Sequence, residues 1–151
     1  MELNKYSHGV GQNAFHIVLC PKYRRCVLAI PKVKQACESY LREIADKHNF
    51  EIHEMQVMKD HVHLFVCAKP TYSPSQLLQL FKGYSAYKLF RQFPYLRNSY
   101  FRKGHFWSAG KFCRSVGNVT ADTIKHYIAQ SQGEWKFPDT SGFHQHQTKL
   151  F

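Results

Sequence analysis

The stretch EIHEMQVMKDHVHLFVCA, residues 51–68, decides the fold. Residues 51–58 are predicted to form a strand, Lys59 and Asp60 a short polar turn, and residues 61–68 the returning strand. Two strand segments joined by a tight turn predict a β-hairpin. Because the strands of a hairpin are antiparallel, the sheet that contains this one is not all-parallel.

Helical patterns flank the hairpin on both sides. Apolar residues recur at helical spacing over residues 31–48, and Pro31 suits the first turn of a helix. A second helix is expected over residues 73–93. Ser73 would cap it, and Gln76 would complete a capping box.

Three more segments complete the expected order. Residues 13–19 and part of residues 105–116 are predicted strands, and residues 120–132 a last helix. Thr120 would cap that helix, with Asp122 near its positive end. The order β, α, β-β, α, β, α predicts an α+β fold. Its antiparallel sheet would carry helices on one face and leave the other face open.

Length and composition indicate one domain. The 151 residues suffice for a single core, which we assign to residues 1–136, with a polar tail over residues 137–151 that is mobile or docked on a partner. Five cysteines without a CxxC pair predict neither a disulfide framework nor a zinc ribbon. The first residues lack the apolar core of a signal peptide, and the longest apolar run is far too short to cross a bilayer. We therefore expect a cytoplasmic protein.

The distribution of charge points to nucleic acid. The formal net charge is +11, and no Asp or Glu occurs between Asp60 and Asp122. That acid-free stretch contains nine Lys or Arg residues and many aromatic residues. Cations bind phosphates and aromatic rings stack on unpaired bases, so single-stranded nucleic acid is the expected partner. The alternative is that most of these rings belong to the core.

His61 and His63 are candidate metal ligands. Side chains two residues apart on a strand point to the same face, so both imidazoles leave one face while Val62 and Leu64 leave the other. The apolar pair belongs on the helix-covered face, which puts the histidines on the open one. Two neighbouring neutral imidazoles form half of a divalent-metal site. The competing interpretation is a pair of half-buried aromatic residues.

Tyr127, on the last predicted helix, is the candidate nucleophile. A tyrosine can attack a phosphodiester and keep the bond energy in a phosphotyrosine link. Its phenol ionises near pH ~10, so a Lewis acid on the phosphate would be needed. Taken alone, a tyrosine at this position could equally be a packing residue.

Four blocks in this order make the chain resemble a known family over residues 13–132. They are CPKYRR at 20–25, MQVMKDHVHLFV at 55–66, SPSQLLQLFKGYSAYKLF at 73–90 and FWSAGKFCRSVGNV at 106–119. The chain is similar to the TnpA-type single-tyrosine transposases of the smallest bacterial and archaeal insertion sequences, within the HUH endonuclease superfamily.

The resemblance implies a ferredoxin-like or RNA-recognition-motif-like sheet with a tyrosine-bearing C-terminal helix. It implies a homodimer that acts on single-stranded DNA hairpins with Mg²⁺ or Mn²⁺, with the tyrosine helix carried on either subunit. Cleavage would leave a 5′-phosphotyrosine on Tyr127 and a free 3′-OH, and strand joining would consume no nucleotide triphosphate. His61 and His63 take the place of the family's metal-binding histidines.

One position departs from the family pattern. The family places a glutamine four residues after the tyrosine as a third metal ligand, and here that position is Ser131. Gln130 and Gln132 flank it, and Gln130 lies nearer the Tyr127 face at about 100° per residue. Gln130 is the expected third ligand. Asp60 is expected to be a turn residue and not a ligand.

We assign DNA binding to basic and polar residues in or beside the four blocks. They are Lys22, Arg24, Arg25, Lys82, Ser85, Lys88, Arg91, Arg102, Lys103, Lys111 and Arg114.

Two other functions compete with an active transposase. The Ser131 departure leaves open a domesticated relative that binds hairpin DNA and cuts it poorly. A passive nucleic-acid-binding module is the alternative from another class. Its sheet would present stacking aromatic residues in place of a histidine pair facing a tyrosine.

Overall fold

The fold was analysed in a computed structural model that describes residues 13–110, 112–117, 120 and 122–127. Its strands are β1 (Asn13–Leu19), β2 (Glu51–Val57), β3 (Val62–Ala68) and β4 (Phe112–Val116). Its long helices are α2 (Pro31–Lys47) and α3 (Pro74–Gln92). Short helical turns span Lys22–Arg24, Cys26–Ala29 and Leu96–Tyr100. The expected order of elements is confirmed.

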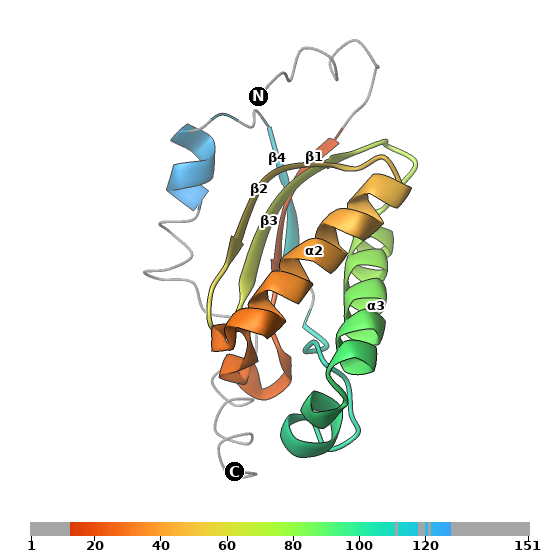
Figure 1. The fold of residues 1–151 in the computed structure, drawn as a ribbon. Helices are drawn as coiled ribbons and strands as arrows, with labels where there is room; N and C mark the ends of the chain where they lie inside the picture. The colour runs from red at the N-terminus through yellow and green to blue at the C-terminus, as the bar shows by residue number, and fades with distance from the viewer. Residues whose placement is uncertain (1–12, 111, 118–119, 121, 128–151) are drawn as a thin grey trace.

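The strands form one antiparallel sheet in the order β2-β3-β1-β4. β1 and β3 are therefore the central strands, although 42 residues separate Leu19 from Val62. α2 and α3 lie together on one face of the sheet, as Figure 1 shows. This arrangement is the predicted ferredoxin-like α+β fold.

The hairpin forms where the sequence predicts it. Glu51 pairs with Cys67 and Val57 pairs with Val62, with a bulge between Ile52 and Glu54. The turn is closed by a hydrogen bond from the backbone N–H of Met58 to the carbonyl of His61. The hairpin turn thereby fixes the position of His61 directly before β3.

Local sequence signals explain where both long helices begin. Pro31 occupies the first turn of α2, where its missing N–H leaves no helical bond unmade. Ser73 caps α3 as predicted: its Oγ accepts from the N–H of Gln76, and the Gln76 side chain accepts from the N–H of Ser73. Both backbone donors at this helix end are thus satisfied.

The helix-covered face of the sheet holds the main core. Ile17, Leu19, Val62, Leu64 and Val66 point into it and are almost completely buried. α2 contributes its apolar side chains, such as Leu41, and α3 contributes others. The alternation along β1 and β3 therefore sorts side chains by face, as the sequence predicts.

The other face of the sheet is not open, and that expectation was wrong. A helical segment, residues 122–127, lies on the side opposite α2 and α3 (Figure 1). We call it the tyrosine helix. Ile124 is buried there in a second apolar cluster with Phe65, Cys67 and Val116, and Tyr127 packs against the cluster. The exposed apolar surface of the sheet provides the physical reason, because covering it removes that surface from water.

Thr120 caps the tyrosine helix as predicted, since its Oγ1 accepts from the N–H of Thr123. The expected continuation of this helix to residue 132 lies outside the described residues, as does the proposed tail, 137–151. Within the described part of the chain, no helix combines the length and the apolar character needed to cross a membrane.

Candidate active site

The histidine pair consists of His61, which directly precedes β3, and His63, the second residue of β3, on the sheet face that carries the tyrosine helix. The two ring centroids are 4.8 Å apart and the rings are nearly perpendicular. The placement on the face away from Leu64 and Val66 agrees with the sequence prediction. The sequence also predicted that this face is open, and there the structure differs. His63 is fully buried, because residues of β1, β3 and the tyrosine helix cover this face.

Asp60 orients His61. Nδ1 of His61 lies 2.8 Å from Oδ1 of Asp60, and because a carboxylate only accepts, the imidazole is the donor. The other oxygen of Asp60 forms an ion pair of 2.9 Å with Arg24. The bond from His61 lowers the pKa of Asp60, with Arg24 acting in the same direction. Asp60 is therefore more than the turn residue that the sequence suggested.

His63 is paired with a histidine that the sequence analysis did not single out. Nε2 of His16, on β1, lies 3.1 Å from Nδ1 of His63, and the rings are stacked with centroids 5.3 Å apart. Burial, and then the neighbouring His61, lowers the pKa of His63 to about 4. The alternation in β1 could have revealed His16, because it shares a face with Ala14 and Val18.

Tyr127 lies on the same face as the histidine pair. Its ring centroid is 5.9 Å from that of His16 and 6.3 Å from that of Phe65. The guanidinium carbon of Arg114 lies 4.1 Å from the Tyr127 ring centroid, which is a close cation–π contact. His16 therefore lies close to both His63 and the Tyr127 ring.

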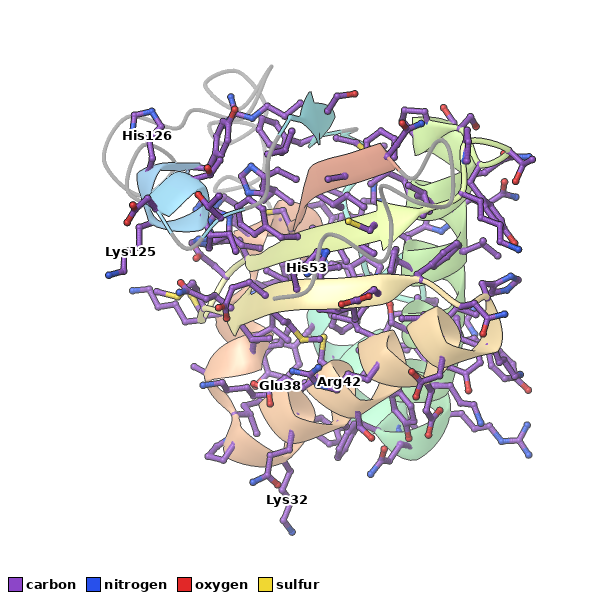
Figure 2. All side chains as sticks on the ribbon, turned by 90° about the horizontal axis from the view of Figure 1, so that it is seen from above. Lys32, Glu38, Arg42, His53, Lys125 and His126 are labelled. Carbon is purple, nitrogen blue, oxygen red and sulfur yellow. The ribbon has the colours of Figure 1, made fainter. Side chains whose placement is uncertain are left out.

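The tyrosine helix is held on the sheet by an apolar contact. Ile124 anchors it in the second apolar cluster, three residues before Tyr127 and on the same helix face. Lys125 and His126 are exposed and point away from the sheet, on the opposite side of the molecule from Arg42 and Lys32 of α2 (Figure 2). In this chain Tyr127 therefore lies on the sheet face that carries His16 and the histidine pair.

The histidine pair fits half of a divalent-metal site. Asp60 contacts His61 at Nδ1 and His16 contacts His63 at Nδ1, so both of these contacts are made away from Nε2. Nε2 of His63 is buried and has no hydrogen-bond partner within the described part of the chain. No third His, Cys, Asp or Glu joins the pair among the described residues. Gln130, Ser131 and Gln132 lie outside them.

Two of the expected DNA-binding residues flank this site. Arg24 forms an ion pair with Asp60, and the guanidinium of Arg114 lies over the Tyr127 ring. Arg114 is exposed on the sheet surface, opposite His16 in the pairing of β4 with β1. The structure therefore places positive charge next to the tyrosine and the histidine pair.

Lys22 lines a separate pocket of about 540 Å³ between α3 and residues 104–109, which we call the α3 pocket. Tyr87, Phe90 and Arg97 also line it. Lys82 lies at its wall and donates hydrogen bonds to the carbonyls of Ser108 (2.9 Å) and Gly110 (2.8 Å). The pocket combines basic and aromatic side chains, as a nucleic-acid surface requires.

Ser85 does not present its hydroxyl to solvent, which contradicts a direct DNA contact. It is fully buried, accepts a hydrogen bond of 2.8 Å from Nε1 of Trp107, and donates one of 2.6 Å to the carbonyl of Phe81. Lys82 and Ser85 of α3 therefore anchor the loop that carries Trp107. Sequence reasoning missed this role because the partner lies 22 residues away in the chain.

The remaining basic residues assigned to DNA are spread over the surface. Lys88 lies over the rings of Tyr40 and Tyr84, and Arg91 donates a hydrogen bond of 2.8 Å to the Tyr87 hydroxyl. Arg25 lies over the Tyr100 ring. Arg102 and Lys103 are exposed, whereas Lys111 lies outside the described residues.

Fold and site together define a class: a small ferredoxin-like α+β protein whose sheet carries a histidine pair beneath a tyrosine-bearing helix. Residues 10–131 match the family model described as Transposase IS200 like. Because the match covers most of the chain, the protein belongs to the IS200-like transposase family, whose function is DNA transposition.

Sequence relatives agree with this assignment. The chain is 32% identical to the ISDra2 transposase TnpA of Deinococcus radiodurans over 128 residues, which cover 85% of this chain and 90% of the relative. It is 35% identical to the transposase for insertion sequence element IS200 of Salmonella typhimurium over 121 residues, or 78% of each chain.

Solved structures agree on the fold. A crystal structure of a candidate transposase from Deinococcus radiodurans R1 matches with a TM-score of 0.65 and 30% identity, over 80% of this chain and 92% of that one. A REP-associated tyrosine transposase bound to a REP hairpin matches with a TM-score of 0.54 and 17% identity, over 83% of this chain and 70% of that one. The second likeness concerns the fold alone.

Proposed function

We propose that this transposase uses a divalent metal ion to cleave and rejoin single-stranded DNA at hairpin-marked ends, with Tyr127 as the nucleophile. The observation that carries the proposal is that His16 lies close to both His63 (3.1 Å between Nε2 and Nδ1) and the Tyr127 ring (5.9 Å between centroids), on one face of the sheet. A passive nucleic-acid-binding module has no need of this combination. Its sheet would offer stacking rings to bases instead.

In the proposed cleavage step, Oη of Tyr127 attacks the scissile phosphorus. The bond from phosphorus to the 3′ oxygen breaks, so the protein keeps a 5′-phosphotyrosine and the other strand end becomes a 3′-OH. The phenol loses one proton and the 3′ oxygen gains one, so no net proton is released. A second 3′-OH reverses the step, and the stored bond energy makes a nucleotide triphosphate unnecessary.

His61 and His63 would hold the metal ion through their Nε2 atoms, with Gln130 as the proposed third ligand. Mg²⁺ or Mn²⁺, when bound, supplies a Lewis acid that withdraws charge from the phosphate oxygens. The protein's own contribution is to hold both imidazoles in a fixed orientation. It also holds the tyrosine ring against Arg114 on the same face.

The proposed substrate combines a shaped anchor with a free strand. The α3 pocket and the exposed basic residues can bind phosphates, and their aromatic neighbours can stack on unpaired bases. One protein of the same fold is bound to a REP hairpin, and we propose a hairpin as the anchor for this chain as well. We further propose that two copies act together as a homodimer, as the family resemblance implies.

The test is incubation of the protein with single-stranded element-end DNA and Mg²⁺, followed by denaturing electrophoresis. A covalent protein-DNA adduct is expected with the single-stranded hairpin, together with much weaker binding and no cleavage of the same sequence as a perfect duplex. Chelation of the metal, His61→Ala or His63→Ala should abolish the adduct. Comparable cleavage of the duplex would contradict the single-strand mechanism.

The Ser131 departure favours one second candidate, a relative that binds hairpin DNA but cuts it poorly. The same assay separates the two functions. Tight, salt-sensitive binding of the hairpin without any adduct would support the binding protein and contradict the proposed nuclease activity.

A further inference from the structure

His16 is a buried polar residue that the proposed reaction does not yet use. It is fully buried in the middle of β1, a central strand of the sheet, among apolar neighbours. Its ring is parallel to Phe65 with centroids 4.4 Å apart, and Phe112 meets it edge-on at 5.5 Å. These contacts on two sides leave the imidazole little freedom to rotate.

The ring is oriented toward His63. Nε2 of His16 and Nδ1 of His63 are 3.1 Å apart, which is hydrogen-bond distance. Only one proton fits between these two nitrogen atoms, so one ring must donate this hydrogen bond and the other must accept it.

The direction of the hydrogen bond decides whether His63 can bind an ion. If His16 donates, the proton of His63 is on Nε2 and that atom has no lone pair for a metal. If His63 donates through Nδ1–H, its Nε2 carries the lone pair. In the described part of the chain, Nε2 of His63 is buried without a hydrogen-bond partner, as is Nδ1 of His16.

We propose that His16 is a positioning residue whose Nε2 accepts the Nδ1–H of His63 and so holds Nε2 of His63 ready for the divalent ion. This inference rests on the proposed metal-dependent function. It gives the histidine pair two matching supports, because Asp60 accepts the Nδ1–H of His61 in the same way. Groups that hold a metal-binding imidazole by its other nitrogen fix both the tautomer and the ring orientation.

The supports differ in charge, and the difference has a structural reason. Asp60 lies in the turn between β2 and β3, where the positive charge of Arg24 compensates its negative charge. His16 lies in the interior beside Arg114 and the Tyr127 ring, where a neutral acceptor adds no buried charge. A neutral imidazole therefore suits the buried position better than a carboxylate would.

Two variants of His16 test the proposal. His16→Gln places an amide oxygen near the position of Nε2 and keeps an acceptor, whereas His16→Phe keeps a flat ring and removes it. His53→Phe is the matched control, since His53 is a histidine of β2 whose side chain contacts Cys67, 2.9 Å away, and not the pair. Mn²⁺ binding is measured by electron paramagnetic resonance without DNA. The tautomer of His63 is read from long-range proton–nitrogen NMR correlations.

In the wild-type protein the His63 proton should be found on Nδ1. His16→Phe should weaken Mn²⁺ binding by about tenfold or more and mix the His63 tautomers. His16→Gln should keep the wild-type tautomer and an affinity within about threefold of wild type, and His53→Phe should keep the wild-type affinity. This pattern cannot come from a merely structural role, because Gln fills the site less well than Phe.

Three results would overturn the inference. One is a wild-type His63 that carries its proton on Nε2, and another is unchanged Mn²⁺ affinity in His16→Phe. The third is direct coordination of the ion by His16, seen as a metal-dependent shift of its own Nε2 resonance. Failure of the proposed function looks different: Mn²⁺ binding to the wild-type protein would then be absent or would survive His63→Ala.

Discussion

At the scale of single residues, each candidate metal-ligand histidine lies at hydrogen-bond distance from one side chain through its Nδ1 atom. Asp60 accepts from His61 at 2.8 Å, and His16 lies 3.1 Å from His63. The Tyr127 ring is in a cation–π contact with Arg114. The chemistry of the site therefore depends on residues that contact the candidate ligands and nucleophile, as well as on those residues themselves.

Asp60→Ala should weaken metal binding, because His61 loses the acceptor that fixes its tautomer. A fall in Mn²⁺ affinity of about tenfold is expected, measured by isothermal titration of the DNA-free protein. Asp46→Ala, which removes an exposed carboxylate of α2, is the control and should bind Mn²⁺ as the wild-type protein does. Equal affinities in the two variants would show that Asp60 does not support the site.

Arg114→Ala should slow cleavage by roughly two- to fivefold, the amount expected for an exposed cation–π contact on the nucleophile. Single-turnover cleavage of a hairpin substrate at saturating protein measures this step apart from DNA binding. Arg42→Ala, an exposed arginine on α2 across the sheet, should leave the rate unchanged (Figure 2). A rate for Arg114→Ala equal to that of Arg42→Ala would contradict the assigned contact.

The sequence predicted the histidine pair and Tyr127, but it did not predict the supports of the pair. The HxH spacing indicates by itself that His61 and His63 share a face. The contact of His16 with His63 depends on the register of β1 against β3, in which Val18 faces His63 and His16 faces Phe65. A single sequence does not contain that register, because turn and packing geometry set it.

At the scale of elements, α3 and the loop that follows it form one unit. Ser85 and Lys82 hold this loop at Trp107, Ser108 and Gly110 through hydrogen bonds. The backbone N–H of Ser108 also donates to the carbonyl of Cys20, 2.8 Å away. The segment that carries Lys22 is thereby linked to the wall of the α3 pocket.

Ser85→Ala should destabilise the protein by about 1–3 kcal/mol, because it leaves the buried N–H of Trp107 without its acceptor. Urea unfolding followed by tryptophan fluorescence measures this loss. Ser75→Ala, at an exposed position in the first turn of α3, should stay within about 0.5 kcal/mol of the wild-type value. An unchanged unfolding free energy in Ser85→Ala would mean that the hydrogen bond contributes nothing.

The elements themselves were predictable to within a few residues, whereas the docking of the last helix was not. Pro31 and Ser73 mark their helix starts by local chemistry, and both starts are confirmed. The face on which a short helix settles depends instead on which apolar surface remains uncovered after the sheet has formed. Ile124 and Tyr127 show the i, i+3 spacing that packs on such a surface, and this was the available signal.

At the scale of the whole molecule, two neutral histidines inside the sheet link folding to pH. The folded-state pKa values of His16 and His63 are about 3 and about 4, below the ordinary value of 6.5. Between pH 6.5 and about 4, the unfolded chain therefore binds protons that the folded chain does not. Stability should fall as the pH falls, by up to about 1.4 kcal/mol per pH unit for each imidazole.

His16→Gln should reduce this slope by up to about 1.4 kcal/mol per pH unit, because one of the two linked groups is gone. Urea unfolding at pH 7, pH 5.5 and pH 4.5 compares the variant with the wild-type protein. Carboxylates such as Asp60 contribute equally to both proteins and cancel in the difference. Parallel stability curves for the two proteins would contradict the burial of a neutral His16.

The most direct test of the central claim, that Tyr127 is the nucleophile of this transposase, is to identify the residue that becomes linked to DNA. A single-stranded hairpin substrate is cleaved with Mg²⁺, the adduct is digested with trypsin and nuclease, and the modified peptide is sequenced by mass spectrometry. We expect a phosphodeoxynucleotide on Tyr127, attached through its 5′ phosphate, and no adduct from a Tyr127→Phe variant that still binds the hairpin. An adduct on another residue, or one that persists in Tyr127→Phe, would contradict it.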